Sequence, residues 1–231
     1  MLRDCYIIIL ASGMGKRFGK SVKMPKQLIN LAGKPILCYS LETAISLAGK
    51  DRVILTYPKG MLKQFSNLLR KYDYDVMLVE GGERRQDSVY NAISIIKNEK
   101  SVVLIHDSAR PLATKELFKR VYDCAKLNGA AIPVVMATET VKEVSKGIVK
   151  KTLDRKHIGF SQTPQGFKLE LLKRVIDVSD FDTEYTDEAM LLESHGIKVH
   201  TVEGERLNLK LTFEEDLDII KSFAEIIWKK E

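Results

Sequence analysis

The chain has 231 residues, of which 45% are hydrophobic and 29% charged, a balance typical of a folded globular domain and not of a disordered one. Its longest apolar run is about half a dozen residues, far short of the ~20 that span a bilayer, and it shows no signal-peptide core, so we expect a cytoplasmic protein without a membrane anchor. Although the net charge is +6, the 37 basic residues form no dense tract, which favours a small anionic substrate over nucleic acid.

Short apolar runs typical of β-strands alternate along the chain with segments of helical periodicity. This order predicts a single α/β domain over residues 1–231, Rossmann-like, with a mostly parallel twisted sheet and flanking helices. The expected strands are 6–10, 52–57, 76–79, 102–105, 130–136, 197–202 and 208–211. The expected helices are 35–48, 61–72, 87–96, 114–125, 169–178, 188–194 and 212–227, the last with a capping box formed by Thr212 and Glu215.

Residues 140–153 break this pattern. They read as two polar, alternating strands around the turn Ser145-Lys146-Gly147. Because so charged a ribbon buries little by itself, we expect a β-hairpin arm, at about 138–160, that protrudes from the domain.

The three cysteines, Cys5, Cys38 and Cys124, lie far apart and show no Cys-x-x-Cys spacing. This excludes both a disulfide framework and a zinc site. We expect Cys38 and Cys124 to be packing residues on apolar helix faces.

The most informative stretch is residues 11–27, which read ASGMGKRFGKSVKMPKQ and directly follow the apolar run 6–10. Glycines let a main chain approach a ligand closely, and clustered backbone N–H groups bind anions. Arg17 and Lys26 can add positive charge, so the stretch predicts a polyphosphate site. It is neither a P-loop nor a dinucleotide fingerprint, whose third glycine is replaced by Phe18. On glycine spacing alone, an ordinary strand-to-helix turn is an equal alternative.

Further motifs follow the predicted strands at their carboxyl ends, where ligands bind in open α/β sheets. They are GGERRQDSV at 81–89, HDSARP at 106–111, DR at 154–155, TPQ at 163–165, TDEA at 186–189 and NLKLT at 208–212. We expect His106 to be a strand-end residue with a satisfied hydrogen bond, and Arg110 to pair with a neighbouring carboxylate. Asp187 and Glu188 suit a helix start for electrostatic reasons alone.

The glycine-rich stretch, with the triplet Pro25-Lys26-Gln27, resembles the first loop of the sugar-nucleotide pyrophosphorylase superfamily. The full set of motifs, in this order and spacing, is similar to the 2-C-methyl-D-erythritol 4-phosphate cytidylyltransferase family of the non-mevalonate isoprenoid pathway. Two departures are visible. Ser12 replaces the usual Ala or Gly, and the family's Pro-Val-x-Asp-Thr-x-Lys pattern is two residues longer here, with Glu139 in place of Asp.

The resemblance implies transfer of CMP from CTP to 2-C-methyl-D-erythritol 4-phosphate with release of pyrophosphate, assisted by Mg²⁺, in a homodimer formed by arm exchange. It implies four catalytic cations: Arg17 and Lys26 at the triphosphate, and Arg155 and Lys210 at the methylerythritol phosphate. The matched nucleotide-binding residues are Ala11, Ser12, Gly13, Gly82, Glu83 and Ser88. The matched substrate-side residues are Asp107, Thr140, Arg155, Thr163 and Thr186, of which Asp107 is also the expected carboxylate near the metal.

Two other functions share parts of this pattern. A ribitol-5-phosphate cytidylyltransferase has the same loop and chemistry, but its counterparts of Asp87-Ser88-Val89 and of residues 186–189 typically read Asn-Asp-Thr and Ser-Asp-Ala. A non-catalytic nucleotide sensor would keep the pocket. The joint presence of all four catalytic cations argues against a sensor.

Overall fold

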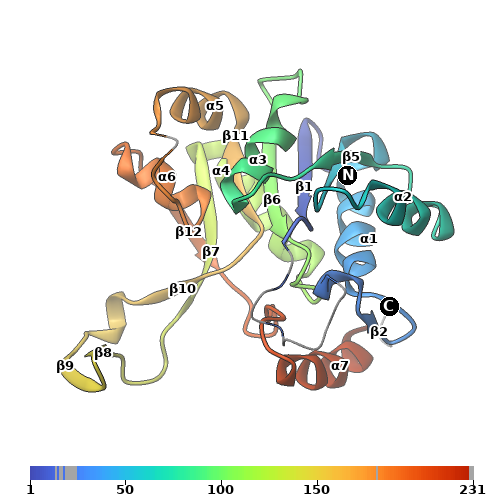
Figure 1. Cartoon of the computed structure of the whole chain (residues 1–231). Helices are drawn as coiled ribbons and strands as arrows, with labels where there is room; N and C mark the ends of the chain where they lie inside the picture. Colours follow the sequence, from blue (N-terminus) through green and yellow to red (C-terminus); the bar gives the residue numbers. More distant parts are fainter. Residues whose placement is uncertain (14, 16–17, 19–24, 181, 229–231) are drawn as a thin grey trace.

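A mostly parallel β-sheet organises the computed structural model, which describes residues 1–13, 15, 18, 25–180 and 182–228 (Figure 1). Within these residues the sheet has eight strands in the order β10-β7-β11-β6-β1-β4-β5, with β12 paired to β7. They are β1 (Cys5–Leu10), β4 (Val53–Tyr57), β5 (Met77–Glu80), β6 (Val102–Asp107), β7 (Ala130–Met136), β10 (Gly159–Ser161), β11 (Gln165–Lys168) and β12 (His200–Glu203). β1 pairs in parallel with β4 and β6, whereas β11 runs antiparallel to β6. The predicted α/β architecture is confirmed.

Helices cover both faces of this sheet. They are α1 (Ile36–Ala48), α2 (Leu62–Lys71), α3 (Arg85–Ser94), α4 (Lys115–Asn128), α5 (Leu169–Val178), α6 (Glu188–Ser194) and α7 (Glu215–Trp228). Because successive side chains of a strand point to opposite faces, Ile7 and Ile9 pack in the core beneath α1, α2 and α4, while Ile8 packs in the core beneath α3, α5 and α6. A strand buried on both faces reads as a continuous apolar run, which made β1 visible in the sequence. Among the described residues, no helix is both long and apolar enough to cross a membrane.

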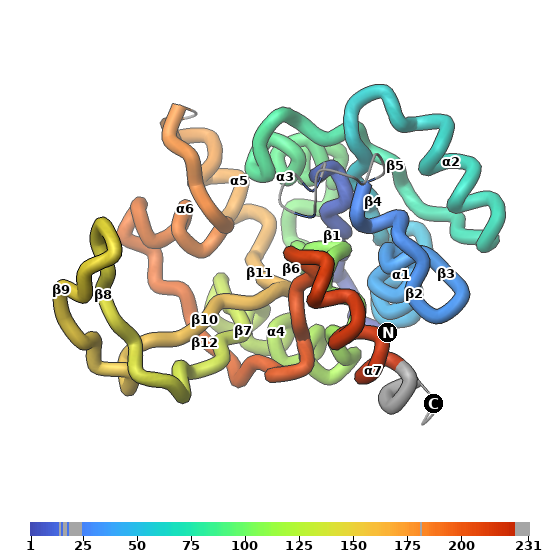
Figure 2. Tube along the Cα trace, turned by 60° about the horizontal axis from the view of Figure 1, so that its bottom comes forward, coloured from blue at the N-terminus to red at the C-terminus, as the bar shows by residue number. Residues whose placement is uncertain are grey.

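The C-terminal helix α7 lies against β2 (Asn30–Leu31) and the start of α1 (Figures 1 and 2). Its Ile220 packs with Phe18, Ala109 and Leu211 in a third apolar cluster. These three partners belong to the glycine-rich stretch, to the segment after β6 and to the segment before α7. One helix therefore supports three separate segments that carry sequence motifs.

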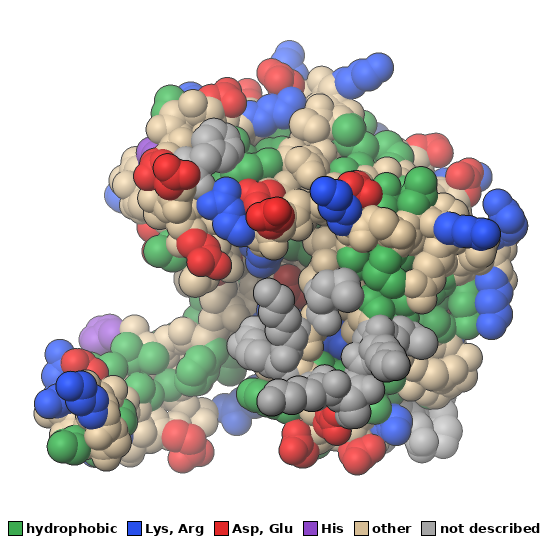
Figure 3. All heavy atoms as spheres, in the orientation of Figure 1, with side chains coloured by type: hydrophobic (Ala, Val, Ile, Leu, Met, Phe, Trp, Pro, Cys, Tyr) green, Lys and Arg blue, Asp and Glu red, His purple; other side chains and the backbone are tan. Residues whose placement is uncertain are grey.

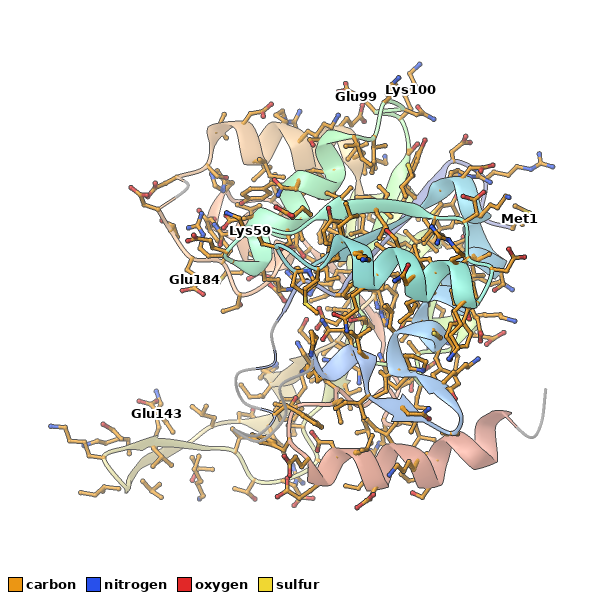
Figure 4. The ribbon with its side chains drawn as sticks, turned by 45° about the vertical axis from the view of Figure 1, so that its right-hand side comes forward. Met1, Lys59, Glu99, Lys100, Glu143 and Glu184 are labelled. Carbon is orange, nitrogen blue, oxygen red and sulfur yellow. The ribbon has the colours of Figure 1, made fainter. Side chains whose placement is uncertain are left out.

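The predicted hairpin arm is present. β8 (Lys142–Ser145) pairs antiparallel with β9 (Ile148–Thr152), and the turn residues Lys146 and Gly147 have φ angles of 50° and 77°, the positive pair that a type I′ turn needs. Every residue of both strands is exposed. The arm extends away from the body, with Glu143 far from the sheet and hydrophobic and basic side chains next to one another on its surface (Figures 3 and 4). The chain then returns to the sheet through β10.

The strand predicted at 208–211 is wrong. This segment is irregular: Leu211 N–H donates to the carbonyl oxygen of Ala109 (2.9 Å), and the Asn208 side chain donates to the carbonyl oxygen of Thr163 (2.9 Å). Isolated bonds to different partners satisfy the segment without a strand ladder.

The capping box predicted at the start of α7 is also wrong in its partner. The Asp216 carboxylate, rather than that of Glu215, accepts hydrogen bonds from the N–H groups of Thr212 (2.7 Å) and Phe213 (2.8 Å). The helix therefore begins slightly later than expected, at Glu215.

Candidate active site

A pocket of about 330 Å³ opens at the carboxyl ends of β1 and β6, beside the loop between β5 and α3. It brings together the residues that the sequence assigns to the nucleotide, with part of the catalytic set. The predicted residues in its lining are Ala11, Ser12, Gly13, Lys26, Gly82, Glu83, Ser88, Asp107 and Lys210. Motifs far apart in the sequence thus meet at one sheet edge, as parallel strands require.

Two loops form one wall of the pocket through a pair of serines. Ser12 Oγ donates to Ser88 Oγ (2.8 Å), which also accepts from Gly82 N–H (3.1 Å). A Cβ at Gly81 would lie 2.2 Å from Ser12 Cβ, and one at Gly82 would lie 2.2 Å from Asp87 Cβ. Gly81 is therefore needed for the two loops to approach this closely, and Gly82 for its own loop to lie against the first turn of α3. Ser12, the departure from the usual small residue, supplies a bond between them.

Gln27 holds the glycine-rich stretch, and the sequence analysis did not assign it a role. Its buried amide donates to the carbonyl oxygens of Ala11 and Gly13, the latter at 3.1 Å. Ala11 N–H donates in turn to Thr56 Oγ1 of β4 (3.0 Å). The triplet Pro25-Lys26-Gln27 was a signal for Gln27, whereas a lone hydroxyl in an apolar strand gave none for Thr56.

Cations surround one buried carboxylate in the pocket. Lys210 Nζ lies 2.6 Å from Asp107 Oδ2, and Arg85 Nε lies 3.6 Å from Asp107 Oδ1. Lys26 Nζ donates to the carbonyl oxygen of Leu211, the residue after Lys210. Burial alone would raise the pKa of Asp107, but the neighbouring cations, Lys210 foremost, lower it below its usual range. Asp107 is therefore ionised at neutral pH.

His106, at the end of β6, has a structural role. Its Nε2 faces the carbonyl oxygen of Arg110 (3.2 Å), which can only accept, so Nε2 carries the proton. Nδ1 then accepts from the Thr163 hydroxyl (3.1 Å), whose oxygen accepts from Asp107 N–H (3.1 Å). Burial lowers the pKa of His106 to about 4, so the imidazole is neutral at pH 7. The prediction of a satisfied strand-end histidine is confirmed.

Arg110 does not make the carboxylate pair that the sequence predicted. Its Nη1 donates instead to the carbonyl oxygen of Asn208 (2.7 Å). This bond ties the HDSARP motif to the irregular segment 208–211, and so helps to place Lys210 against Asp107.

Of the predicted substrate side, Asp107 and Lys210 line the pocket and the other residues do not. Arg155 is exposed in a short 3-10 helix at the base of the arm, and Thr140 is exposed where the arm begins. Thr186 is exposed just before α6. Thr163 is buried and reaches the pocket only through its bond to the Asp107 backbone. Arg17 lies outside the described residues.

The described part of the chain contains no group of three or more His, Cys, Asp or Glu side chains that could hold a metal ion. Glu83 and Asp107 line the pocket, and Asp107 is already paired with Lys210. One carboxylate between cations fits a divalent ion only where a bound ligand supplies most of its oxygen atoms.

A mostly parallel α/β sheet that brings a glycine-rich loop and two lysines to one pocket at its carboxyl edge is the arrangement expected of a nucleotidyltransferase. The model of the 2-C-methyl-D-erythritol 4-phosphate cytidylyltransferase family matches residues 5–228, and the chain belongs to this family.

Individual relatives agree with this assignment. The chain is 40% identical over 215 residues to the cytidylyltransferase of that name from Aquifex aeolicus, covering 93% of this chain and 94% of the relative. It is 38% identical over 213 residues to the enzyme of that name from Endomicrobium trichonymphae, covering 92% of this chain and 94% of the relative. The crystal structure of the Francisella tularensis enzyme of that name superposes with a TM-score of 0.79 at 34% identity, covering 94% of this chain and 98% of that chain.

Proposed function

We propose that this chain transfers CMP from CTP to 2-C-methyl-D-erythritol 4-phosphate. An oxygen of the phosphate monoester attacks the α-phosphorus of CTP, the bond to the β-phosphate breaks, and 4-diphosphocytidyl-2-C-methyl-D-erythritol and pyrophosphate are formed. The observation that carries this proposal is the pocket in which Lys26, Lys210 and Asp107 lie beside the cradle of Ser12, Ser88 and Gly82.

The charges and hydrogen bonds of the pocket suit this reaction. A phosphate monoester, with a second pKa of about 6, is already largely ionised at neutral pH, so its attack needs no strong base. The neutral, fully hydrogen-bonded His106 is consistent with that. The main barrier is repulsion between two polyanions, which cations and alignment reduce.

We assign the cations to the two substrates by their position. Lys26, with Arg17, is proposed to stabilise charge on the triphosphate. Lys210 is proposed to bind the α-phosphate and the incoming phosphate, because Asp107 holds it at the carboxyl end of β6. Ala11, Gly13 and Glu83, which line the same pocket, are proposed to bind the nucleotide together with Ser12, Gly82 and Ser88.

We further propose that Mg²⁺ acts with the nucleotide. Asp107 is the side chain of the pocket best placed to approach such an ion, and in the same position it can hold substrate hydroxyls. When bound to triphosphate oxygens, the ion would neutralise part of their charge. The lysines described above supply the remaining positive charge from the protein.

The arm is proposed to dock on a second copy of this chain and form a homodimer. Arg155 and Thr140 lie at its base, outside the pocket, and an isolated two-stranded ribbon is marginal in water. Val144, Ile148 and Val149 are all more than half exposed, so the arm offers apolar area for such an interface. Docking would also bring Arg155 and Thr140 toward the methylerythritol phosphate, for which Thr163 and Thr186 are further proposed contacts. Since CTP is a cytoplasmic metabolite, we propose that the enzyme works in the cytoplasm.

Pyrophosphate release tests this function directly. CTP is offered with methylerythritol phosphate or ribitol 5-phosphate in parallel, and UTP and ATP replace CTP in further reactions. We expect release with CTP and methylerythritol phosphate, because a pocket of backbone groups leaves polar atoms unpaired around the wrong base. Faster release with ribitol 5-phosphate would favour a ribitol-5-phosphate cytidylyltransferase, and CTP binding without any release would favour a sensor.

A further inference from the structure

The first turn of α3 contacts two segments that serve different parts of the site. Ser88 faces the glycine-rich stretch through its bond to Ser12. Arg85 and Gln86 reach instead to residues 183–188, the segment that carries Thr186 and leads into α6. Within that segment Glu184 is exposed and points away from the body (Figure 4).

Gln86 binds the backbone of this segment at two points. Its Nε2 donates to the carbonyl oxygen of Thr183 (3.0 Å), and its Oε1 accepts from Tyr185 N–H (2.8 Å). Gln86 is 3% exposed and Tyr185 is 7% exposed, so the bond between them is shielded from water and costs more to break than a surface bond. Together the two bonds fix the backbone on the N-terminal side of Thr186.

Arg85 binds the other end of the same segment. Its Nη1 donates to both carboxylate oxygens of Glu188, at 2.7 and 2.9 Å, and Glu188 is 2% exposed. Its Nε lies 3.6 Å from Asp107, the partner of Lys210. One guanidinium therefore joins the first residue of α6 to the carboxylate in the pocket, through charge-assisted contacts that are strong when buried.

Building on the proposed function, we propose that Arg85 and Gln86 are positioning residues that couple the nucleotide subsite to the polyol-phosphate subsite. A cytidine nucleotide bound at Ser88 and Gly82 stabilises the first turn of α3, and this turn in turn stabilises residues 183–188. The affinity for methylerythritol phosphate rises when the nucleotide is bound, and the reverse holds by linkage. We expect a coupling of about tenfold, within the usual range for linked sites.

Amide hydrogen exchange of the intact protein, with and without CTP, tests this coupling. CTP should slow exchange over residues 183–188 in the wild type. In Gln86→Met, which loses both hydrogen bonds, that protection should disappear while the CTP affinity changes less than about threefold. Asn91→Ala is the matched control: it removes a bond from the exposed side of the same helix to the carbonyl oxygen of Glu80 and should keep full protection.

A second variant, Arg85→Lys, is tested by steady-state kinetics and by titration with CTP. Arg85→Lys keeps a positive charge near Glu188 but loses the planar guanidinium whose Nη1 binds Glu188 while its Nε faces Asp107. At saturating CTP we expect KM for methylerythritol phosphate to rise about tenfold, and by linkage KM for CTP at saturating methylerythritol phosphate rises by the same factor, while the dissociation constant of CTP for the protein alone changes less than about threefold. A dissociation constant of CTP alone that rises as much as the KM values, protection that persists in Gln86→Met, or a wild type in which CTP leaves 183–188 unprotected would overturn the coupling. The exchange measurement needs no turnover, so absence of pyrophosphate release refutes the proposed function without deciding this inference.

Discussion

The wall of the pocket and the hairpin arm differ in how their residues are held. In the wall, Ser12 bonds to Ser88, 76 residues away, Gln27 bonds back to Ala11 and Gly13, and Gly81 allows the two loops to meet. In the arm, β8 and β9 pair with each other and every residue of both strands is exposed. The nucleotide side is therefore built within one chain, whereas the proposed substrate side depends on what the arm contacts.

Removing a cation from the nucleotide side of the pocket should have the largest effect on turnover. Lys26→Ala and, from the sequence, Arg17→Ala should each lower turnover by about 10²- to 10³-fold, the usual loss of one preorganised donor. Lys26→Ala also loses the bond to the Leu211 carbonyl, at a cost to stability of about 1 kcal/mol. Turnover measured beside thermal unfolding checks both expectations; near-normal turnover in a folded variant would contradict the assigned role.

Shortening the arm around Lys146 and Gly147 should impair the proposed substrate side and leave the nucleotide side of the pocket intact. We expect monomers that bind CTP normally but use methylerythritol phosphate roughly a hundredfold less well, because Arg155 is then misplaced. Sedimentation and CTP titration give the two measurements, with the intact chain as the control. An intact chain that is monomeric at micromolar concentration and fully active would remove the basis for arm docking.

Acid should lower the free energy of unfolding through protonation of His106, which lies at the end of β6 beside the pocket. Its pKa falls from 6.5 to about 4 on folding because the ring is buried, so between these pH values the unfolded chain binds the extra proton. The contribution of neutral His106 to the free energy of unfolding is therefore fully present above pH 6.5. It is lost as the pH falls, by about 3 kcal/mol at pH 4.

Urea unfolding at pH 7 and pH 4 measures this loss. His106→Gln, which takes up no proton, should lose about 3 kcal/mol less over the same interval than the wild type. His157→Gln, on the exposed 3-10 helix of the arm, should behave as the wild type does. Parallel losses in the wild type and His106→Gln would show that other groups govern the acid response.

The smallest effect should come from the bond between the two serines. Ser12→Ala restores a residue usual at this position in the family but loses the donor to Ser88. One neutral hydrogen bond contributes about 1 kcal/mol, so KM for CTP should rise about fivefold with kcat unchanged. An isothermal titration with CTP would show the same ratio, and a change above a hundredfold would mean that Ser12 does more than join the loops.

Much of the site could be predicted because its residues lie in contiguous motifs at strand ends. Asp107 ends the apolar strand β6 and Ser88 lies in the motif after β5, and parallel strands bring such ends to one edge, whereas Lys210 was found through its own motif after β12. Gln27 and Thr56 were missed as site residues because their role is to hold a backbone, which leaves little trace in residue type.

Other features depend on contacts that no local pattern records. The segment 208–211 has the alternation of a strand but is held by isolated bonds to Ala109 and Thr163, and so forms none. Arg110 bonds a carbonyl oxygen where a carboxylate was expected. The environment of Arg155 depends on a second molecule in our proposal, which the sequence of one chain does not place.

The third apolar cluster has a consequence for how the protein is made. Ile220 and Ala224 of α7 pack on Phe18, Ala109 and Leu211, one residue from each of three motif-bearing segments. A ribosome synthesises the chain from its N-terminus, so α7 emerges after every strand of the sheet. A nascent chain can thus form β1, β4 and β6 while the segments around its nucleotide pocket still lack their contacts with α7. Nucleotide binding should appear late in synthesis, when α7 leaves the exit tunnel.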